Sequence, residues 1–214
     1  MRWIRQKGWK KRWKRLRRRL GANLRSLWDR LVELFLRVSG ELQRRAVVAR
    51  LQPGDIILAC PRTRRLSPAA LAYRLLLGAR FVHSMLYIGQ GRILHTTSKR
   101  GVVVSGVPRR IYRRDRYAIY RMPGLGEEHR RAIVARALEW KGKKLDLAGL
   151  LTNVPGRMLG LKRALWVQEE GRVWCSKLIA RAYLEAGFPI LPQEELNRVT
   201  SEDLARSDKL VRVR

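Results

Sequence analysis

Apolar residues recur every three or four positions over the first forty residues of the chain. They are Trp9, Trp13, Leu16, Leu20, Leu24, Leu27, Leu31, Leu34, Phe35 and Val38. This is the period of an α-helix, so the pattern predicts one long amphipathic helix from about residue 8 to Ser39. We expect a bend at Gly21, a stop at Gly40 and a second short helix over residues 41–49.

The pattern changes near residue 50. The run Gln52-Pro53-Gly54-Asp55 predicts a turn, and the apolar residues 56–59 after it predict a buried strand. Further segments of β-rich composition follow at short spacing, which favours an antiparallel meander. The strands are expected at residues 81–88, 92–97, 101–104 and 117–122.

Helices are expected around and after these strands. Ser67-Pro68 is a good start for a helix that ends near Gly78, and Ser201 is a good cap for a late one. The other helical segments are 127–140, a patch from Asp146 and 174–186, and residues 209–214 favour a last strand. The predicted organisation is a helical extension over residues 1–49 and an α+β domain over residues 50–214.

Charge sets the extension apart. The chain of 214 residues has 48 Lys and Arg against 17 Asp and Glu, and residues 1–19 hold eleven of these cations with no acid. Phospholipid head groups, nucleic-acid phosphates and acidic cell-wall polymers are the natural partners of such an arm, although a solubilising tail has the same composition. Its tryptophans among Lys and Arg suit a membrane interface, whereas the later aliphatic stripe is also typical of a helix packed on its own domain.

Two cysteines, Cys60 and Cys175, cannot build a disulfide framework, and no clustered Cys and His suggest a metal. No metal and no organic cofactor is therefore expected. Charged residues interrupt the apolar run 27–38, so it resembles neither a signal peptide nor a membrane span. We expect a soluble cytoplasmic protein, or one that is peripheral at a membrane.

The candidate chemistry lies in two stretches, residues 81–95 and 173–187. Cys175 stands in the first turn of a predicted helix, whose amides and dipole should lower the pKa of the thiol and can hold an oxyanion. His83 lies on an apolar strand and His95 on the next one, so His83 is the candidate base and His95 the group that orients it. His129 in a charged helix is expected to face solvent, and Cys60 to be a small buried residue.

Whether His95 faces His83 depends on the hairpin between them. A two-residue loop at Gln90-Gly91 would pair His95 with Leu86 and turn it away. A three-residue loop Gly89-Gln90-Gly91, with Gly91 left-handed, would pair it with Met85 on the side of His83. The site therefore requires the three-residue loop.

Five elements together resemble the NlpC superfamily of papain-like cysteine hydrolases, in the circularly permuted branch that includes the YiiX-like and lecithin:retinol acyltransferase-like families. They are Gly54-Asp55-Ile56, the strand from His83 to Gly89, His95, the segment Gly142 to Asp146, and Cys175-Ser176-Lys177-Leu178-Ile179. The resemblance covers roughly residues 50–190. It implies a permuted papain-like fold, in which a small, nearly barrel-shaped antiparallel sheet packs on the helix that carries Cys175.

The same resemblance implies a cysteine hydrolase that acts on an acyl bond through Cys175, His83 and His95, with an amide of a cell-wall peptide favoured as substrate. A membrane-bound lipid acyltransferase or thioesterase with the same three residues is the alternative. A non-catalytic basic protein that binds nucleic acid or an anionic membrane is another. The chain departs from YiiX-like members at His95, where they often have Glu, at Leu145, and at Lys177, which favours an anionic substrate or faces solvent.

Overall fold

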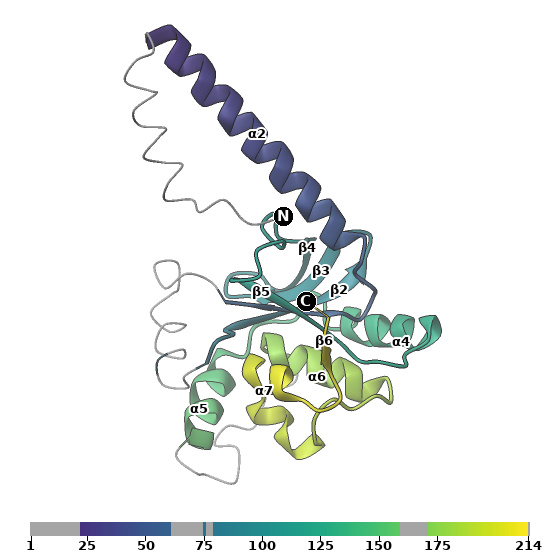
Figure 1. Ribbon diagram of the computed structural model, residues 1–214. Coiled ribbons are helices and arrows are strands. Elements are labelled where there is room, and N and C mark those ends of the chain that lie inside the picture. Colours follow the sequence, from purple (N-terminus) through teal and green to yellow (C-terminus); the bar gives the residue numbers. More distant parts are fainter. Residues whose placement is uncertain (1–21, 61–74, 76–78, 159–170, 214) are drawn as a thin grey trace. The chain divides into compact units, whose positions relative to one another are not determined.

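The computed structural model describes residues 22–60, 75, 79–158 and 171–213 (Figure 1). The chain forms two compact units, residues 1–45 and residues 46–214. The predicted bend at Gly21 and the predicted helix at residues 67–78 lie outside the described residues, apart from Leu75, which is helical. Within the described ranges, no helix combines the length and the apolarity that crossing a membrane requires.

Helix α2 runs without a break from Ala22 to Val48. The predicted stop at Gly40 is therefore wrong, and the two helices expected on either side of it are one. Gly40 does not take the positive φ that ends a helix. Glu41 pairs with Arg44 at 2.8 Å and with Arg45 at 3.5 Å in the next turn. Good helix formers around a single glycine offset its cost of about 1 kcal/mol.

The second unit is built on a six-stranded antiparallel sheet of order β4-β3-β2-β1-β5-β6. Its strands lie close to the predicted ones: β1 Ile56–Ala59, β2 His83–Gly89, β3 Arg92–Thr97, β4 Gly101–Gly106, β5 Tyr117–Arg121 and β6 Val211–Arg212. Strands β2, β3 and β4 form a meander as expected, but the expectation that the segment 117–122 continues it is wrong. The fifth strand instead pairs with the free side of β1, so β1 lies inside the sheet, and all four of its residues are buried.

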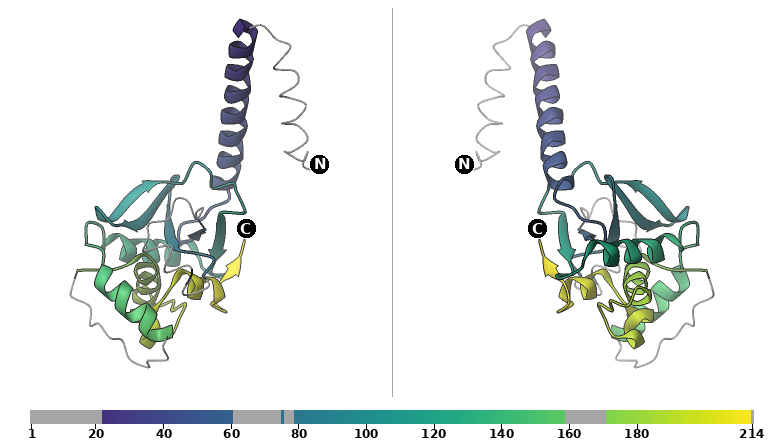
Figure 2. Two further views of the ribbon diagram at one scale, coloured as in Figure 1. Left: turned by 90° about the vertical axis from the view of Figure 1, so that its left-hand side faces the viewer. Right: turned by 90° about the vertical axis from the view of Figure 1, so that its right-hand side faces the viewer.

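Helices cover one face of this sheet (Figures 1 and 2). They are α4 Glu127–Leu138, α5 Leu147–Met158, α6 Cys175–Glu185, the 3₁₀ helix η2 Gln193–Arg198 and α7 Ser201–Arg206. Side chains of α4, α6 and α7 pack on alternate residues of β1, β2 and β3, among them Leu58, Leu86 and Leu94. The N-cap of α7 is Thr200 and not the predicted Ser201, because Thr200 and Asp203 close a capping box.

The other face of the sheet has its own apolar cluster. Ile57, Met85, Tyr87, Ile93 and Ile119 point to this side, because side chains alternate along each strand. The segment after β4 covers them with Val107 and Ile111. The two clusters make β1 and β2 strands that are buried on both faces, which explains their nearly continuous apolar sequences.

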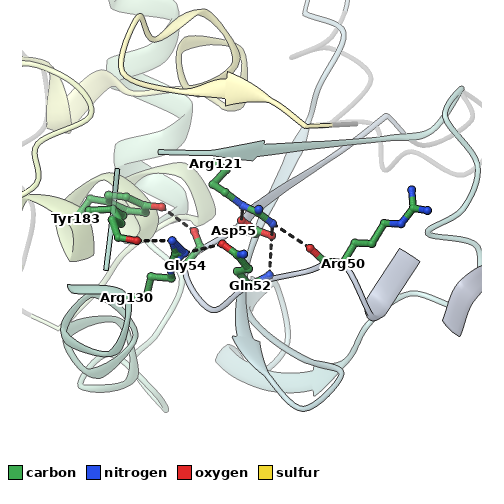
Figure 3. A network of polar contacts seen from close by, with 8 residues as sticks. Arg50, Gln52, Gly54, Asp55, Arg121, Arg130 and Tyr183 are labelled. Carbon is green, nitrogen blue, oxygen red and sulfur yellow. Dashed lines mark hydrogen bonds and ion pairs between the residues drawn. The ribbon is translucent and has the colours of Figure 1, made fainter. Parts of the chain in front are cut away.

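A polar network locks the turn into β1 (Figure 3). The carboxylate of Asp55, which is 1% exposed, accepts two hydrogen bonds of 2.7 Å from Arg121 on β5 and one of 2.8 Å from the main-chain amide of Gln52. Tyr183 of α6 donates to the carbonyl of Gly54 at 2.6 Å, and Arg130 of α4 donates to Gln52. The Gly54-Asp55 turn thereby joins β1, β5, α4 and α6, which holds the helix of Cys175 against the sheet.

Candidate active site

The β2-β3 hairpin brings the two predicted imidazoles together. Its turn is the two-residue kind, because Gly89 pairs with Arg92 and both Gln90 and Gly91 have positive φ. The predicted three-residue loop is therefore wrong. A bulge between Tyr87 and Gly89 shifts the register by one residue, so that Leu86 pairs with Leu94.

The shifted register turns His95 toward His83, which is what a three-residue loop was expected to do. With Leu86 opposite Leu94, His95 falls opposite Met85 and faces the side of His83. Nε2 of His83 lies 3.1 Å from Nδ1 of His95, and the two rings meet edge to face. The imidazole pair predicted from the sequence is thus present in the structure.

Ser105 on β4 extends this pair, and the sequence reasoning missed it. Its Oγ lies 3.0 Å from Nε2 of His95. The register explains the contact, since His95 pairs with Val103 and Ser105 stands two residues further on the same face of β4. The alternation of side chains along β4 is visible in the sequence and could have indicated Ser105. To apply it, one would also need to know how β3 pairs with β4.

The three side chains form a chain of hydrogen bonds with two possible directions. If His83 is to accept a proton on Nδ1, its own proton must be on Nε2 and be donated to Nδ1 of His95. His95 then carries its proton on Nε2 and donates it to Oγ of Ser105. Burial lowers the pKa of His83 to about 4 and that of His95 to about 4, the latter with help from the charges of His83 and Arg100. Both rings are therefore neutral at pH 7, as this arrangement requires.

Helix α6 begins at Cys175, one residue after the predicted start, and this start is anchored from two sides. Nε1 of Trp174 and Oγ of Ser176 both donate to the carbonyl of Val199 at 2.8 Å. On the other side, Lys144 and Arg172 form a parallel bridge, and the amide of Val173 donates to the carbonyl of Lys144 at 3.0 Å. These contacts replace a side-chain cap, which Trp174 cannot supply.

Asp146 completes this second anchor. It is buried, its amide donates to the carbonyl of Val173, and its Oδ1 accepts the amide of Gly149 at 2.8 Å. The segment Gly142 to Asp146, noted in the sequence for its resemblance to a YiiX-like element, therefore connects the start of α5 with the residues that lead into Cys175. The segment thus has a structural role, which is to hold the residues before Cys175 in place.

The thiol of Cys175 lies among hydroxyl groups. Burial raises its pKa, although main-chain groups of Ser84 and Ser176 and the hydroxyls of Ser84 and Ser201 lower it in part. Those two hydroxyls are 2.7 Å apart. The predicted lowering of the pKa of this thiol is therefore wrong, because desolvation outweighs the helix start.

The thiol and the imidazoles lie on two sides of β2. Cys175 contacts Ser84, which points to the face covered by α6, whereas alternation directs His83 to the other face. Among the described residues, no hydrogen bond joins Cys175 to His83 or His95. The structure thus brings the two imidazoles together. It places the thiol of Cys175 beside Ser84, which follows His83 on β2 and points to the opposite face.

Lys177 is buried and does not face solvent, which removes one of the two expectations for it. The side chain is 2% exposed, donates to Oδ1 of Asn197 and lies 4.9 Å from the ring centre of Trp174. Burial lowers its pKa to about 8, opposed in part by the charge of Asp146. The ammonium therefore links α6 to η2 next to the candidate nucleophile.

His129 lies apart from this chemistry, whereas Cys60 directly follows Ala59, the partner of His83 on β1. His129 on α4 is exposed and packs against Phe188. Cys60 is half-buried beside the cluster under α6, close to the expectation of a small buried residue. In the part of the chain that the structure describes, no group of three or more His, Cys, Asp or Glu could hold a metal ion.

The sequence matches no protein-family model and no curated protein. A solved structure is nevertheless similar, the crystal structure of the metalloprotein YiiX from Escherichia coli O157:H7. The two chains are 16% identical and superpose with a TM-score of 0.56 over 76% of this chain and 96% of YiiX. At this identity the likeness concerns the fold alone. The chain therefore has an α+β fold of the YiiX kind, with a six-stranded antiparallel sheet at its centre.

Proposed function

We propose that residues 50–214 are a cysteine hydrolase of the permuted papain-like kind, which cleaves an acyl bond through Cys175, His83 and His95. The observation that carries this proposal is the chain of hydrogen bonds from Ser105 through His95 to His83. It occupies Nε2 of His83 and leaves Nδ1 as the nitrogen that can take a proton. A fold of the YiiX kind, with the cysteine at a helix start, supports the same assignment.

The ionisation of the site indicates when the proton moves. A raised pKa for Cys175 and a pKa of about 4 for His83 both favour the neutral thiol and the neutral imidazole. A preformed thiolate and imidazolium pair is therefore not the resting state. Proton transfer accompanies the attack, as in enzymes with a serine nucleophile.

In the first half-reaction, Sγ of Cys175 attacks the acyl carbon and its proton passes to Nδ1 of His83. The main-chain amide of Cys175 faces the oxyanion. When the intermediate collapses, the bond to the leaving nitrogen or oxygen breaks and His83 returns the proton to that atom. Water then attacks the acyl carbon, and His83 takes one of its protons. When the bond between Sγ and the acyl carbon breaks, His83 returns that proton to Sγ, so the acid and the free thiol result.

Direct contact of His83 with Cys175 is the step that substrate binding has to complete. Catalytic hydrogen bonds are often long in proteins without substrate and shorten in the complex. Cys175 is the first residue of α6 and His83 the first of β2, so both are at ends of elements and not in their rigid middles.

We place amide bonds of cell-wall peptides first among the substrates, on the strength of the resemblance. Esters and thioesters of lipids are attacked by the same groups.

YiiX is described as a metalloprotein. A zinc site uses three or four protein ligands. In the part of this chain that the structure describes, the candidate site has two imidazoles, which are hydrogen-bonded to each other, and no third metal-ligating side chain groups with them.

Selective labelling of the thiol tests the proposal. The full chain is treated with iodoacetamide near pH 7, and peptide mapping measures the modification of Cys175 and Cys60 separately. We expect faster labelling of Cys175, slowed at least about tenfold by His83→Ala, because the base assists the attack. His129→Ala is the matched control and should change nothing, since this exposed imidazole is distant from the thiol. Equal labelling of both cysteines, unaffected by His83→Ala, would contradict the proposal.

A further inference from the structure

Helix α2 has an apolar stripe that is exposed along most of its length. Leu24, Leu27, Leu31, Leu34, Phe35 and Val38 are each at least 50% exposed. Their spacing of three and four residues puts them on one side of the helix, about 120° wide once Trp28 is included. An apolar stripe of this size requires a partner that covers it.

The other side of α2 is polar and carries charges of both signs. Glu33 pairs there with Arg37 at 2.7 Å, and beyond the end of the stripe Glu41 pairs with Arg44 and Arg45. These pairs largely compensate one another, so the described helix attracts its partner chiefly through apolar area. The strong positive charge comes from the preceding residues 1–19, with eleven Lys and Arg and the tryptophans Trp3, Trp9 and Trp13.

We infer that the stripe of α2, together with the cationic residues before it, binds the surface of an anionic lipid bilayer. Leucine, phenylalanine and tryptophan on one side of a helix enter the boundary between head groups and acyl chains, while charged residues stay in water. Each Lys or Arg near the surface adds attraction to acidic lipids. Binding in the plane of the surface agrees with α2, which is not apolar enough to cross the membrane.

A second copy of the chain fits the stripe less well. A coiled coil needs apolar residues at alternating steps of three and four over at least three or four heptads. Here the regular series runs from Leu20 to Val38, and Arg17, Glu41 and Arg45 occupy the positions on either side. A parallel pair would also bring together two arms of eleven cations each, which repel one another.

Nucleic acid would use the cations and leave the stripe without a role. Phosphate contacts require Lys and Arg, and an exposed row of leucines contributes nothing to them. A bilayer with acidic lipids is the partner that uses both features. This inference stands independently of the proposed hydrolase, because α2 contains none of its catalytic residues.

Flotation with lipid vesicles tests the inference on the full chain. Vesicles of phosphatidylcholine with phosphatidylglycerol should carry the protein upward, and vesicles of phosphatidylcholine alone should carry much less. Leu31→Glu should weaken binding about tenfold, because it puts a charge in the middle of the stripe. Leu36→Glu is the matched control, since Leu36 is 63% exposed on the same helix but about 140° around its axis from Leu31. It should bind nearly as wild type.

Four results would overturn the inference. One is equal binding of the two vesicle types. A second is an equal effect of the two leucine variants, with helical content unchanged by circular dichroism. Another is a dimer in light scattering that only Leu31→Glu dissociates, with vesicle binding unchanged, which would assign the stripe to a second copy. The last is salt-sensitive binding to duplex DNA without flotation. Cys175→Ala should float as wild type, which separates this test from that of the hydrolase.

Discussion

The imidazole side and the thiol side of the candidate site differ in how far they are assembled. On one face of the sheet, His83, His95 and Ser105 already form a chain of hydrogen bonds of 3.1 and 3.0 Å. On the other face, Cys175 is held among the hydroxyls of Ser84 and Ser201, and its pKa is raised. The proposed base is thus already held by hydrogen bonds, whereas the proposed nucleophile is kept neutral.

This difference indicates where control of the chemistry lies. Strand pairing sets the positions of His95 and Ser105 inside β3 and β4, whereas His83 is the first residue of β2. The thiol depends on the start of a helix anchored through the carbonyl of Val199. Under the proposed function, binding of substrate has to bring Cys175 and Nδ1 of His83 into contact.

The pH dependence of labelling is the largest effect that tests the comparison. Cys175 and His83 are both neutral near pH 7, and in the proposed attack His83 takes the proton, so the wild-type rate with iodoacetamide should change little from pH 6 to 8. In His83→Ala only the thiolate reacts, so the rate should rise about tenfold per pH unit over the same range. The readout is the second-order rate constant for Cys175 by peptide mapping. A rate in His83→Ala that does not rise with pH would instead reveal a stable thiolate, and the two sides would then be equally assembled.

Substitution of His95 should have the next largest effect. His95→Ala removes the acceptor for Nε2 of His83, so release of p-nitrophenol from p-nitrophenyl acetate should fall by roughly 10- to 100-fold. His95→Asn should retain more activity, because an amide oxygen can accept the same hydrogen bond. Equal rates for both variants and wild type would mean that the imidazole pair is only structural.

Ser105 is expected to be a positioning residue with a smaller effect. Loss of one hydrogen bond to a ring is worth about 1 kcal/mol, so Ser105→Ala should lower kcat for the same ester about fivefold and leave KM nearly unchanged. Ser98→Ala, in the exposed turn between β3 and β4, is the matched control. An unchanged kcat, or a loss confined to KM, would remove Ser105 from the relay.

Stability in acid is the mildest test. His83 and His95 have pKa values of about 4 in the folded chain, against 6.5 ordinarily. Between these values the unfolded chain binds protons that the folded chain does not, so the free energy of unfolding falls as the pH drops from about 6.5 to 4. In His83→Asn/His95→Asn, the fall in Tm between about pH 7 and 4.5 should shrink by a few degrees. An unchanged difference would show that the imidazoles are hydrated and not buried.

Local patterns were sufficient for most elements of the fold. Apolar runs and turn residues located β1, β3 and β5 to within a residue, and placed the start of α6 next to Cys175. They were misleading at Gly40 and Thr200. There the favourable contacts, the ion pairs of Glu41 and the capping box with Asp203, decided between neighbouring alternatives of similar energy.

The sequence by itself determined the chemical inventory: the cationic arm, the stripe of α2, and a thiol and two imidazoles at spacings that resemble a cysteine hydrolase. Only the tertiary structure decided how these groups relate. The bulge after Tyr87 turned His95 toward His83, the pairing of β3 with β4 added Ser105, and burial reversed the expected shift of the Cys175 pKa. The reason is physical. Register and desolvation are properties of surfaces that meet from distant parts of the chain, and no local pattern contains them.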